Sequence, residues 1–227
     1  MINPNYAHIW YIAFNSQKLL NINELFQILN ENEKIKSKSF IKQRDQQNYI
    51  ISHAYLRLLL TRYHPDISQK SWKFSKNSYG KPFLSKEHNV AIHFNISHTD
   101  SAVSYIFTRS SICGIDIEED RDIILDRQII NLVLSDKEKS IYQTSRNKNT
   151  LFYRFWTLKE AYLKAYGTGL SQEVQQFDYS FVKNIDSELF VTFNQEGYYY
   201  GTSLIDKTYL SYSIKSLSPL KINFNFL

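Results

Sequence analysis

The chain has 227 residues, which is enough for one large domain or two small ones. Its hydrophobic fraction of 43% and its charged fraction of 22% are ordinary for globular proteins, so a packed core is possible and disorder is not the default, while only 6 Gly and 4 Pro argue against a collagen-like chain. The 27 lysines and arginines outnumber the 22 acidic residues, and the net charge of +5 either attracts acidic proteins and phosphorylated ligands or only keeps the chain soluble. The single cysteine, Cys113, excludes an internal disulfide and a multi-cysteine zinc site.

The ends and apolar runs of the chain bear on where the protein resides. The N-terminal residues lack a basic start followed by an apolar stretch, so no secretory signal is visible. No apolar run approaches the roughly 20 residues that a membrane helix needs. We therefore expect a soluble, cytoplasmic protein with no membrane partner.

In the first half, the hydrophobic pattern predicts a strand, two helices and then short strands. The expected elements are a strand at 9–14, a helix at 21–29 capped by Asn23, a basic segment with Lys34, Lys36, Lys38, Lys42 and Arg44, a helix at 44–63 that Pro65 ends, two short strands within 72–84 around a turn at 77–80, and strands at 91–97 and 102–108.

The second half repeats this order of elements. The expected elements are a strand at 112–117, a helix at 123–134, a helix started by the capping box of Ser135 to Glu138, a helix at 150–166 stopped by Gly167, and strands at 189–194, 198–205 and 208–214, with a hairpin turn at 195–197. The repeated order predicts an α+β fold with two similar halves, 1–109 and 110–227, and a boundary near 109–111.

The run from Gly114 to Glu118 carries the strongest chemical signal. On a strand, residues two apart share a face, so Asp116 and Glu118 project together while Ile115 and Ile117 point into the core. Two neighbouring carboxylates repel each other, and a hard cation with a preference for oxygen, Mg²⁺ above all, would relieve that repulsion. The alternative is an ordinary solvated strand end with acidic residues.

The helix at 150–166 offers a third carboxylate. Glu160 and Lys164 are four residues apart and therefore share a helix face. They could form a surface ion pair of small energy. Alternatively, Glu160 joins the metal site and Lys164 reaches a phosphate bound to that metal, while Lys159 projects about 100° away.

Two further motifs precede the strand that carries Asp116 and Glu118. Ser97 and His98 lie where a strand gives way to a bend; a Ser–His hydrolase pair is disfavoured because adjacent strand residues face opposite sides, so we expect phosphate contacts instead. The run from Tyr79 to Pro82 combines a permissive glycine, a lysine suited to phosphate and a stiff proline, although it is not a P-loop and alone would be an ordinary hairpin turn.

These four motifs, in this order between about residues 80 and 170, resemble those of the surfactin-synthetase-type 4′-phosphopantetheinyl transferases. The resemblance implies two halves related by pseudo-twofold symmetry, with coenzyme A bound in the cleft between them. It assigns Asp116, Glu118 and Glu160 to magnesium, Ser97 and His98 to coenzyme A phosphates, and Lys164 to the diphosphate. It places Gly80, Lys81 and Pro82 near the adenosine end, and the basic residues Lys34 and Lys36 near the 3′-phosphate.

The chemistry and the resemblance converge on one expected reaction. A serine of an apo acyl or peptidyl carrier protein attacks the phosphorus of coenzyme A that bears the pantetheine arm, and 3′,5′-ADP leaves in a Mg²⁺-dependent step, with Asp116 and Lys164 also in the catalytic set. The proton goes either to Glu160 or to a water held by the metal and a carboxylate. The basic chain suits an acidic carrier protein, and one chain could build the whole cleft as a monomer.

Two other classes of function remain. A coenzyme A or nucleotide-binding module would keep the cationic contacts but would not need three carboxylates. A nucleic-acid-binding protein would account for the basic segment at 34–44 and the many aromatics, but no recognised nucleic-acid signature accompanies them. Fatty-acid, polyketide and nonribosomal peptide synthesis all stay open as the pathway served.

Overall fold

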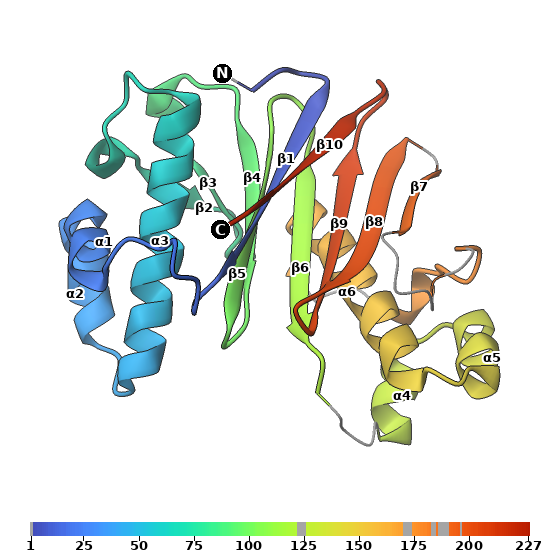
Figure 1. The fold of residues 1–227 in the computed structure, drawn as a ribbon. Coiled ribbons are helices and arrows are strands. Elements are labelled where there is room, and N and C mark those ends of the chain that lie inside the picture. The colour runs from blue at the N-terminus through green and yellow to red at the C-terminus, as the bar shows by residue number, and fades with distance from the viewer. Residues whose placement is uncertain (1, 122–125, 170–173, 183–184, 186–190, 196) are drawn as a thin grey trace.

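The protein is α+β, with two four-stranded sheets packed face to face. The computed structural model describes residues 2–121, 126–169, 174–182, 185, 191–195 and 197–227. The first sheet has the order β10-β1-β5-β4 and the second has the order β6-β9-β8-β7. Figure 1 shows one group of helices flanking the first sheet and another flanking the second.

The first half contains three helices and a hairpin beside its sheet. The helices are α1 (Ile22–Ile28), α2 (Glu31–Lys38) and α3 (Gln43–Tyr63), and the strands are β1 (Tyr6–Ala13), β2 (Phe74–Lys76), β3 (Pro82–Leu84), β4 (His93–His98) and β5 (Ala102–Thr108). The expected elements are present with shifted ends, but α2 was missed, because its residues were expected only as part of a basic segment. The cap of α1 was predicted wrongly: Asn21, and not Asn23, accepts from the backbone of Glu24 in a reciprocal capping box.

The second half follows the expected order as well. Its helices are α4 (Arg127–Val133), α5 (Asp136–Thr144) and α6 (Lys148–Tyr166), and its strands are β6 (Cys113–Glu119), β7 (Val191–Gln195), β8 (Tyr198–Ile205) and β9 (Thr208–Lys215). Gly167 ends α6 in the left-handed conformation, at φ 69°, and Ser135 caps α5 as expected. The first residues of the expected helix at 123–134, the start of the strand expected at 189, and Glu196 in the expected turn lie outside the described residues.

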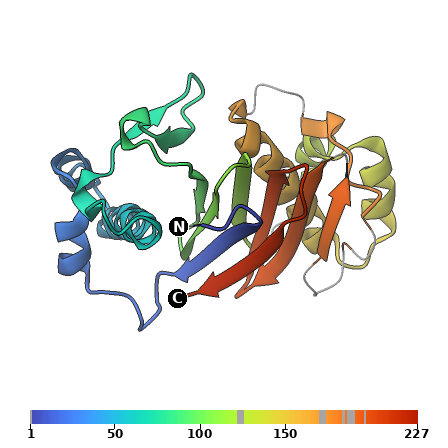
Figure 2. The same cartoon turned by 90° about the horizontal axis from the view of Figure 1, so that it is seen from above.

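The last strand, β10 (Lys221–Phe226), was not expected. It pairs in parallel with β1, so the chain returns to the first sheet after completing the second. The expected boundary near 109–111 falls between β5 and β6, but chain order would have placed β10 in the second half. Figure 2, seen from above, shows β10 lying alongside β1.

Three apolar clusters hold these layers together. One lies between α3 and the first sheet, around Trp10, Tyr105 and Leu60. A second lies between α6 and the second sheet, and a third fills the space between the two sheets and includes Ile115 and Ile117. The sheets therefore share a core, and α3 and α6 cover their outer faces.

The strand edges of β4 and β6 meet along a seam between the halves. No backbone ladder joins these strands in the sheet pairing; instead, side chains of β4 accept hydrogen bonds from backbone N–H groups of β6. Asn95 Oδ1 accepts from Ile115 N at 2.9 Å, and Ser97 Oγ accepts from Ile117 N at 3.3 Å. This seam brings the Ser97 motif next to the carboxylate-bearing strand.

Candidate active site

The two carboxylates of β6 lie on the face that α6 covers. Ile115 and Ile117 are buried between the sheets, and the alternation along the strand turns Asp116 and Glu118 the other way. Asp116 is 3% exposed, so its carboxylate is almost completely removed from water. The expected shared face of the two carboxylates follows from this register.

Gly114 allows β6 and α6 to approach one another closely. A Cβ atom at this position would lie 2.0 Å from the carbonyl oxygen of Ala161 and 2.4 Å from the backbone nitrogen of Ala165. Both obstacles are backbone atoms, which cannot swing aside. The glycine therefore sets the distance between the strand with two carboxylates and the helix with Glu160 and Lys164.

Three polar side chains from three elements meet at the seam. The Lys164 ammonium donates to Asp116 Oδ1 at 2.6 Å and to Ser97 Oγ at 2.9 Å. Ser97 Oγ in turn donates to Asp116 Oδ1 at 3.0 Å. Lys164 therefore does not pair with Glu160, its neighbour one turn earlier, but reaches across to the other half's strand edge.

The other two carboxylates, those of Glu118 and Glu160, lie where burial and a neighbouring negative charge disfavour their ionised form. Burial, and then the negative charge of Asp116, raise the pKa of Glu160 to about 7, although Lys164 acts in the opposite direction. The same two causes raise the pKa of Glu118. Because the charge of Asp116 acts on the pKa values of both Glu118 and Glu160, the three carboxylates share one electrostatic site, with the Lys164 ammonium nearby to offset them.

The residues fit a divalent cation in chemistry and charge. Asp116 Oδ2 and Glu160 Oε1 are buried without a hydrogen-bond partner, and Mg²⁺ prefers oxygen ligands of this kind. Within the described residues, however, no three His, Cys, Asp or Glu side chains come together in an arrangement ready to hold a metal ion. Glu118 Oε1 instead accepts from the indole of Trp156 at 3.2 Å. The carboxylates would have to turn toward a common point to bind the ion.

Ser97 and His98 point to opposite sides of β4, as a strand requires. Ser97 is buried in the seam, and His98 is exposed. Although the residue as a whole is exposed, partial desolvation lowers the pKa of the His98 imidazole and the positive charge of Lys164 lowers it further, which favours the neutral ring. The arrangement gives no Ser–His nucleophile pair, and the Lys164 charge on His98 indicates that the imidazole lies near the carboxylate site.

Comparisons with known proteins agree with this geometry. The family model of the 4′-phosphopantetheinyl transferase superfamily matches residues 112–211, and the model of the 4′-phosphopantetheinyl transferase N-terminal domain matches residues 17–108. Together they cover most of the chain and meet between β5 and β6. The chain belongs to the 4′-phosphopantetheinyl transferase superfamily.

Curated members of this superfamily resemble the chain over a large part of its length. The transferase gsp of Aneurinibacillus migulanus is 30% identical over 159 residues, which are 67% of this chain and 64% of the relative. Sfp of Bacillus subtilis (strain 168) is 29% identical over 63% of this chain and 62% of its own length. HetI of Nostoc sp. is 26% identical over 73% of this chain and 70% of its own length. The match spans slightly less than two thirds of the first two relatives.

The residues expected at the adenosine end and at the 3′-phosphate contact groups other than the carboxylates. Lys81 Nζ donates to two backbone carbonyls, that of Ala165 at 2.7 Å and that of Cys113 at 3.1 Å. Pro82 begins β3 and pairs with Lys76. Lys36, on the exposed side of α2, lies over the ring of Phe40 at 5.5 Å. Of the expected cofactor contacts, Ser97, His98 and Lys164 are therefore gathered at the seam, and Lys36, Lys81 and Pro82 are not.

Two site residues had no assigned role before the structure. Asn95 binds β6 across the seam, and its signal was a polar side chain at a buried position of an otherwise apolar strand. Trp156 of α6 donates its indole N–H to Glu118 Oε1. Lys159 lies apart, as its helical position required: its buried ammonium contacts Glu138 Oε2 at 2.5 Å and the carbonyl of Val133.

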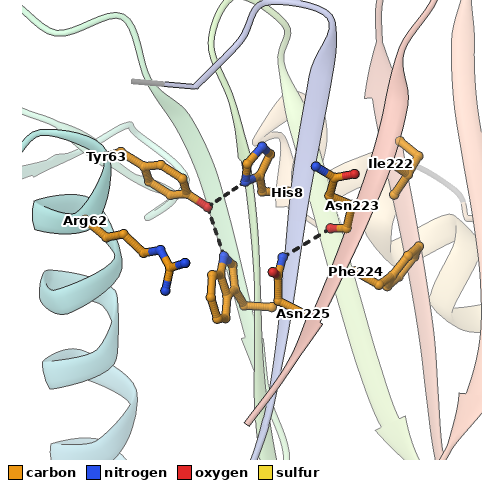
Figure 3. A pocket seen from close by; sticks show the side chains of 8 residues that line it. His8, Arg62, Tyr63, Ile222, Asn223, Phe224 and Asn225 are labelled. Atoms are coloured by element: carbon orange, nitrogen blue, oxygen red, sulfur yellow. Dashed lines mark hydrogen bonds between the residues drawn. The ribbon is translucent and has the colours of Figure 1, made fainter.

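Two hollows that described residues line lie apart from the carboxylate site. Figure 3 shows one of about 380 Å³ between α3, β1 and β10, where Tyr63 accepts from the Trp10 indole at 2.9 Å and contacts His8 Nδ1 at 3.1 Å. The other lies at the start of α6, beside Arg146, Lys148 and Lys207. Neither is lined by Asp116, Glu118 or Glu160.

No helix of the described chain is long and apolar enough to cross a membrane.

Proposed function

We propose that this chain transfers 4′-phosphopantetheine from coenzyme A to a serine of an apo acyl or peptidyl carrier protein and releases 3′,5′-ADP, in a Mg²⁺-dependent reaction. Membership of the superfamily supports the class of reaction. The observation that carries the proposal is the cluster at the seam, where three electrostatically coupled carboxylates lie beside the Lys164 ammonium.

Asp116, Glu118 and Glu160 would hold the magnesium ion. Their excess negative charge and the two unpartnered oxygens are the features that support this assignment. When bound, the ion supplies positive charge at the diphosphate oxygens as the phosphorus–oxygen bond breaks. Lys164 is placed to bind the same diphosphate, because its ammonium can move from Asp116 to a phosphate oxygen once the carboxylates are neutralised.

Several residues of the chain contribute to the transfer step, each in a different way. The carrier serine oxygen forms a bond to the phosphorus that carries the pantetheine arm, and the bond from that phosphorus to the 3′,5′-ADP oxygen breaks, leaving the electron pair on 3′,5′-ADP. Lys164 stabilises the charge on the leaving diphosphate oxygen. Ser97 and the neutral His98 imidazole provide hydrogen bonds to phosphates beside it.

The serine proton needs an acceptor near the same point. Glu160 is one candidate: burial and the charge of Asp116 raise its pKa to about 7 in the metal-free site, so its carboxylate binds a proton more readily than an ordinary glutamate there. A water held by the metal and a carboxylate is the other candidate. The pH profile of turnover in Glu160→Gln separates them, because the ionisation of a Glu160 base would disappear from the profile, whereas the ionisation of a metal-held water would remain.

The protein is predicted to convert an apo carrier to its holo form, which is checked by intact-mass spectrometry with coenzyme A and Mg²⁺. A gain of the mass of phosphopantetheine is expected on at least one of a panel of apo acyl, peptidyl and aryl carriers. No gain on any of them would overturn the proposal. Coenzyme A binding without any mass gain would favour the non-catalytic binding module instead, and retention on nucleic acid without mass gain would favour the nucleic-acid-binding alternative.

A further inference from the structure

The hairpin of β2 and β3, residues 74–84, crosses from the first half to the end of α6 in the second. Its Lys81 ammonium donates to the carbonyl of Ala165 at 2.7 Å and to the carbonyl of Cys113 at 3.1 Å. Ala165 directly follows Lys164, and Cys113 directly precedes Gly114. One side chain of the first half therefore joins the last turn of α6 to the first residue of β6.

A second residue of the same hairpin makes a parallel contact. Asn77 Nδ2 donates to the carbonyl of Gly167 at 2.8 Å, and Asn77 Oδ1 accepts from the backbone nitrogen of Lys81 at 2.9 Å. A Cβ atom at Gly167 would lie 2.7 Å from Asn77 Nδ2 and 2.9 Å from Lys81 Cδ. The hairpin tip is thus in direct van der Waals contact with the end of α6.

Helix ends explain why these contacts hold α6 in place. The last four carbonyls of an α-helix lack partners within the helix, and a cation there also interacts favourably with the helix dipole. Burial lowers the pKa of Lys81, which shows that its ammonium has given up water for these carbonyls. A lysine that only contacts an exposed phosphate would not be desolvated in the absence of that phosphate.

We propose that Lys81 is a positioning residue that holds the last turn of α6, and with it the backbone of Lys164, next to the strand that carries Asp116. The Lys164–Asp116 contact, at 2.6 Å, joins α6 to β6, and Lys81 binds the residue adjacent to Lys164 on the helix and a residue three positions before Asp116 on the strand. This inference rests on the proposed transfer reaction, and it gives Lys81 a different role from the cofactor contact expected from the resemblance.

Kinetics of Lys81→Met separate the two roles. A displaced Lys164 lowers the rate of the chemical step, so kcat should fall about tenfold or more, while KM for coenzyme A should stay within about twofold. Lys76→Met is the matched control, because Lys76 lies on the same hairpin and is exposed; it should leave both constants unchanged. A rise in KM for coenzyme A with kcat unchanged would overturn the inference in favour of a cofactor contact.

A double variant tests whether Lys81 acts through Lys164. In a Lys164→Ala background, Lys81→Met should cause no further loss of kcat, because the group it positions is already absent. Losses that multiply would show that Lys81 acts independently and would overturn the inference.

Hydrogen exchange provides a measurement that does not need activity. The amide of Gly167 bonds to the carbonyl of Leu163 at 2.8 Å, and Lys81→Met should speed exchange across residues 163–167 relative to Lys76→Met. Unchanged exchange there contradicts the inference even if the wild type proves unable to modify any carrier, which would be a failure of the proposed function instead. If Lys81→Met does not fold, Asn77→Ala should show the same faster exchange, and its absence contradicts the inference equally.

Discussion

The two halves of the molecule each contain a buried cluster of charged side chains, and the clusters differ in how their charge is balanced. In the first half, Glu33 on α2 receives two bonds from the Arg57 guanidinium of α3, at 2.7 and 3.0 Å. Burial alone would raise the pKa of Glu33, but hydrogen bonds from His53 and Arg57 hold that pKa below its usual value. The charges of this cluster are therefore balanced by its own residues, and the cluster joins α2 to α3.

The seam cluster has the opposite balance. The Lys164 ammonium pairs with Asp116 alone of the three carboxylates, two carboxylate oxygens have no partner, and the pKa values of Glu118 and Glu160 are raised rather than lowered. A cluster that only held the fold together would be expected to be neutralised from within. A buried charged cluster therefore indicates a site for a cation and a ligand when its charge is not balanced by its own residues, and burial of charge alone does not.

The largest expected effect lies at the seam. Asp116→Ala should lower carrier modification by at least about a hundredfold, because it removes a metal ligand and the partner that orients Lys164. The mass gain of an apo carrier per unit time measures this loss, and circular dichroism checks that the variant is folded. Turnover equal to that of the wild type would show that Asp116 belongs to a passive cluster.

Disruption of the Glu33–Arg57 cluster in the first half should lower the stability of the protein and not its activity. Glu33→Ala leaves the fully buried Arg57 without its carboxylate, which should lower the free energy of unfolding by about 3 kcal/mol. Urea unfolding measures this change. At a temperature where the variant is folded, kcat should match the wild type; a large loss of kcat in the folded variant would erase the distinction between the clusters.

The pH dependence of stability sharpens the comparison further. A carboxyl group whose pKa is about 7 when folded and near 4.5 when unfolded makes unfolding progressively easier as the pH rises from 4.5 to 7. Without divalent cations, Glu160→Gln should therefore be more stable than the wild type at pH 8, and the difference should shrink as the pH is lowered toward 4.5. Thermal unfolding at several pH values measures it, and a difference independent of pH would contradict the raised pKa.

The smallest effect is expected at Cys113. The residue is 1% exposed, and burial raises the pKa of its thiol to about 11, so it is a buried small side chain rather than a nucleophile. Cys113→Ala should keep carrier modification close to the wild-type rate, since Lys81 contacts the backbone carbonyl and not the thiol. Complete loss of activity in a folded variant would show that the thiol takes part in the reaction.

Local patterns in the sequence predicted most elements and the carboxylate face. The alternation from Cys113 to Glu119 was sufficient to place Asp116 and Glu118 together, because strand geometry fixes which residues share a face. The cap at Asn21 was also encoded locally, since Asn21 and Glu24 have capping-box spacing. Attention to that spacing would have avoided the choice of Asn23.

Features that depend on distant contacts could not be predicted in the same way. The alternating apolar residues of β10 signal a strand, but nothing local says that it pairs with β1, more than 200 residues away in sequence. Lys81 carries the same sequence signal whether its ammonium contacts a phosphate or the carbonyl of Ala165. Only the placement of the hairpin against α6 distinguishes these roles.

Magnesium binding tests the difference between the clusters most directly. Isothermal titration of Mg²⁺ in the presence of coenzyme A should show one ion per chain for the wild type and for Glu33→Ala, and no ion for Asp116→Ala. Equal magnesium binding by the wild type and Asp116→Ala would contradict the account, because the uncompensated carboxylates at the seam would then not be where the cation binds.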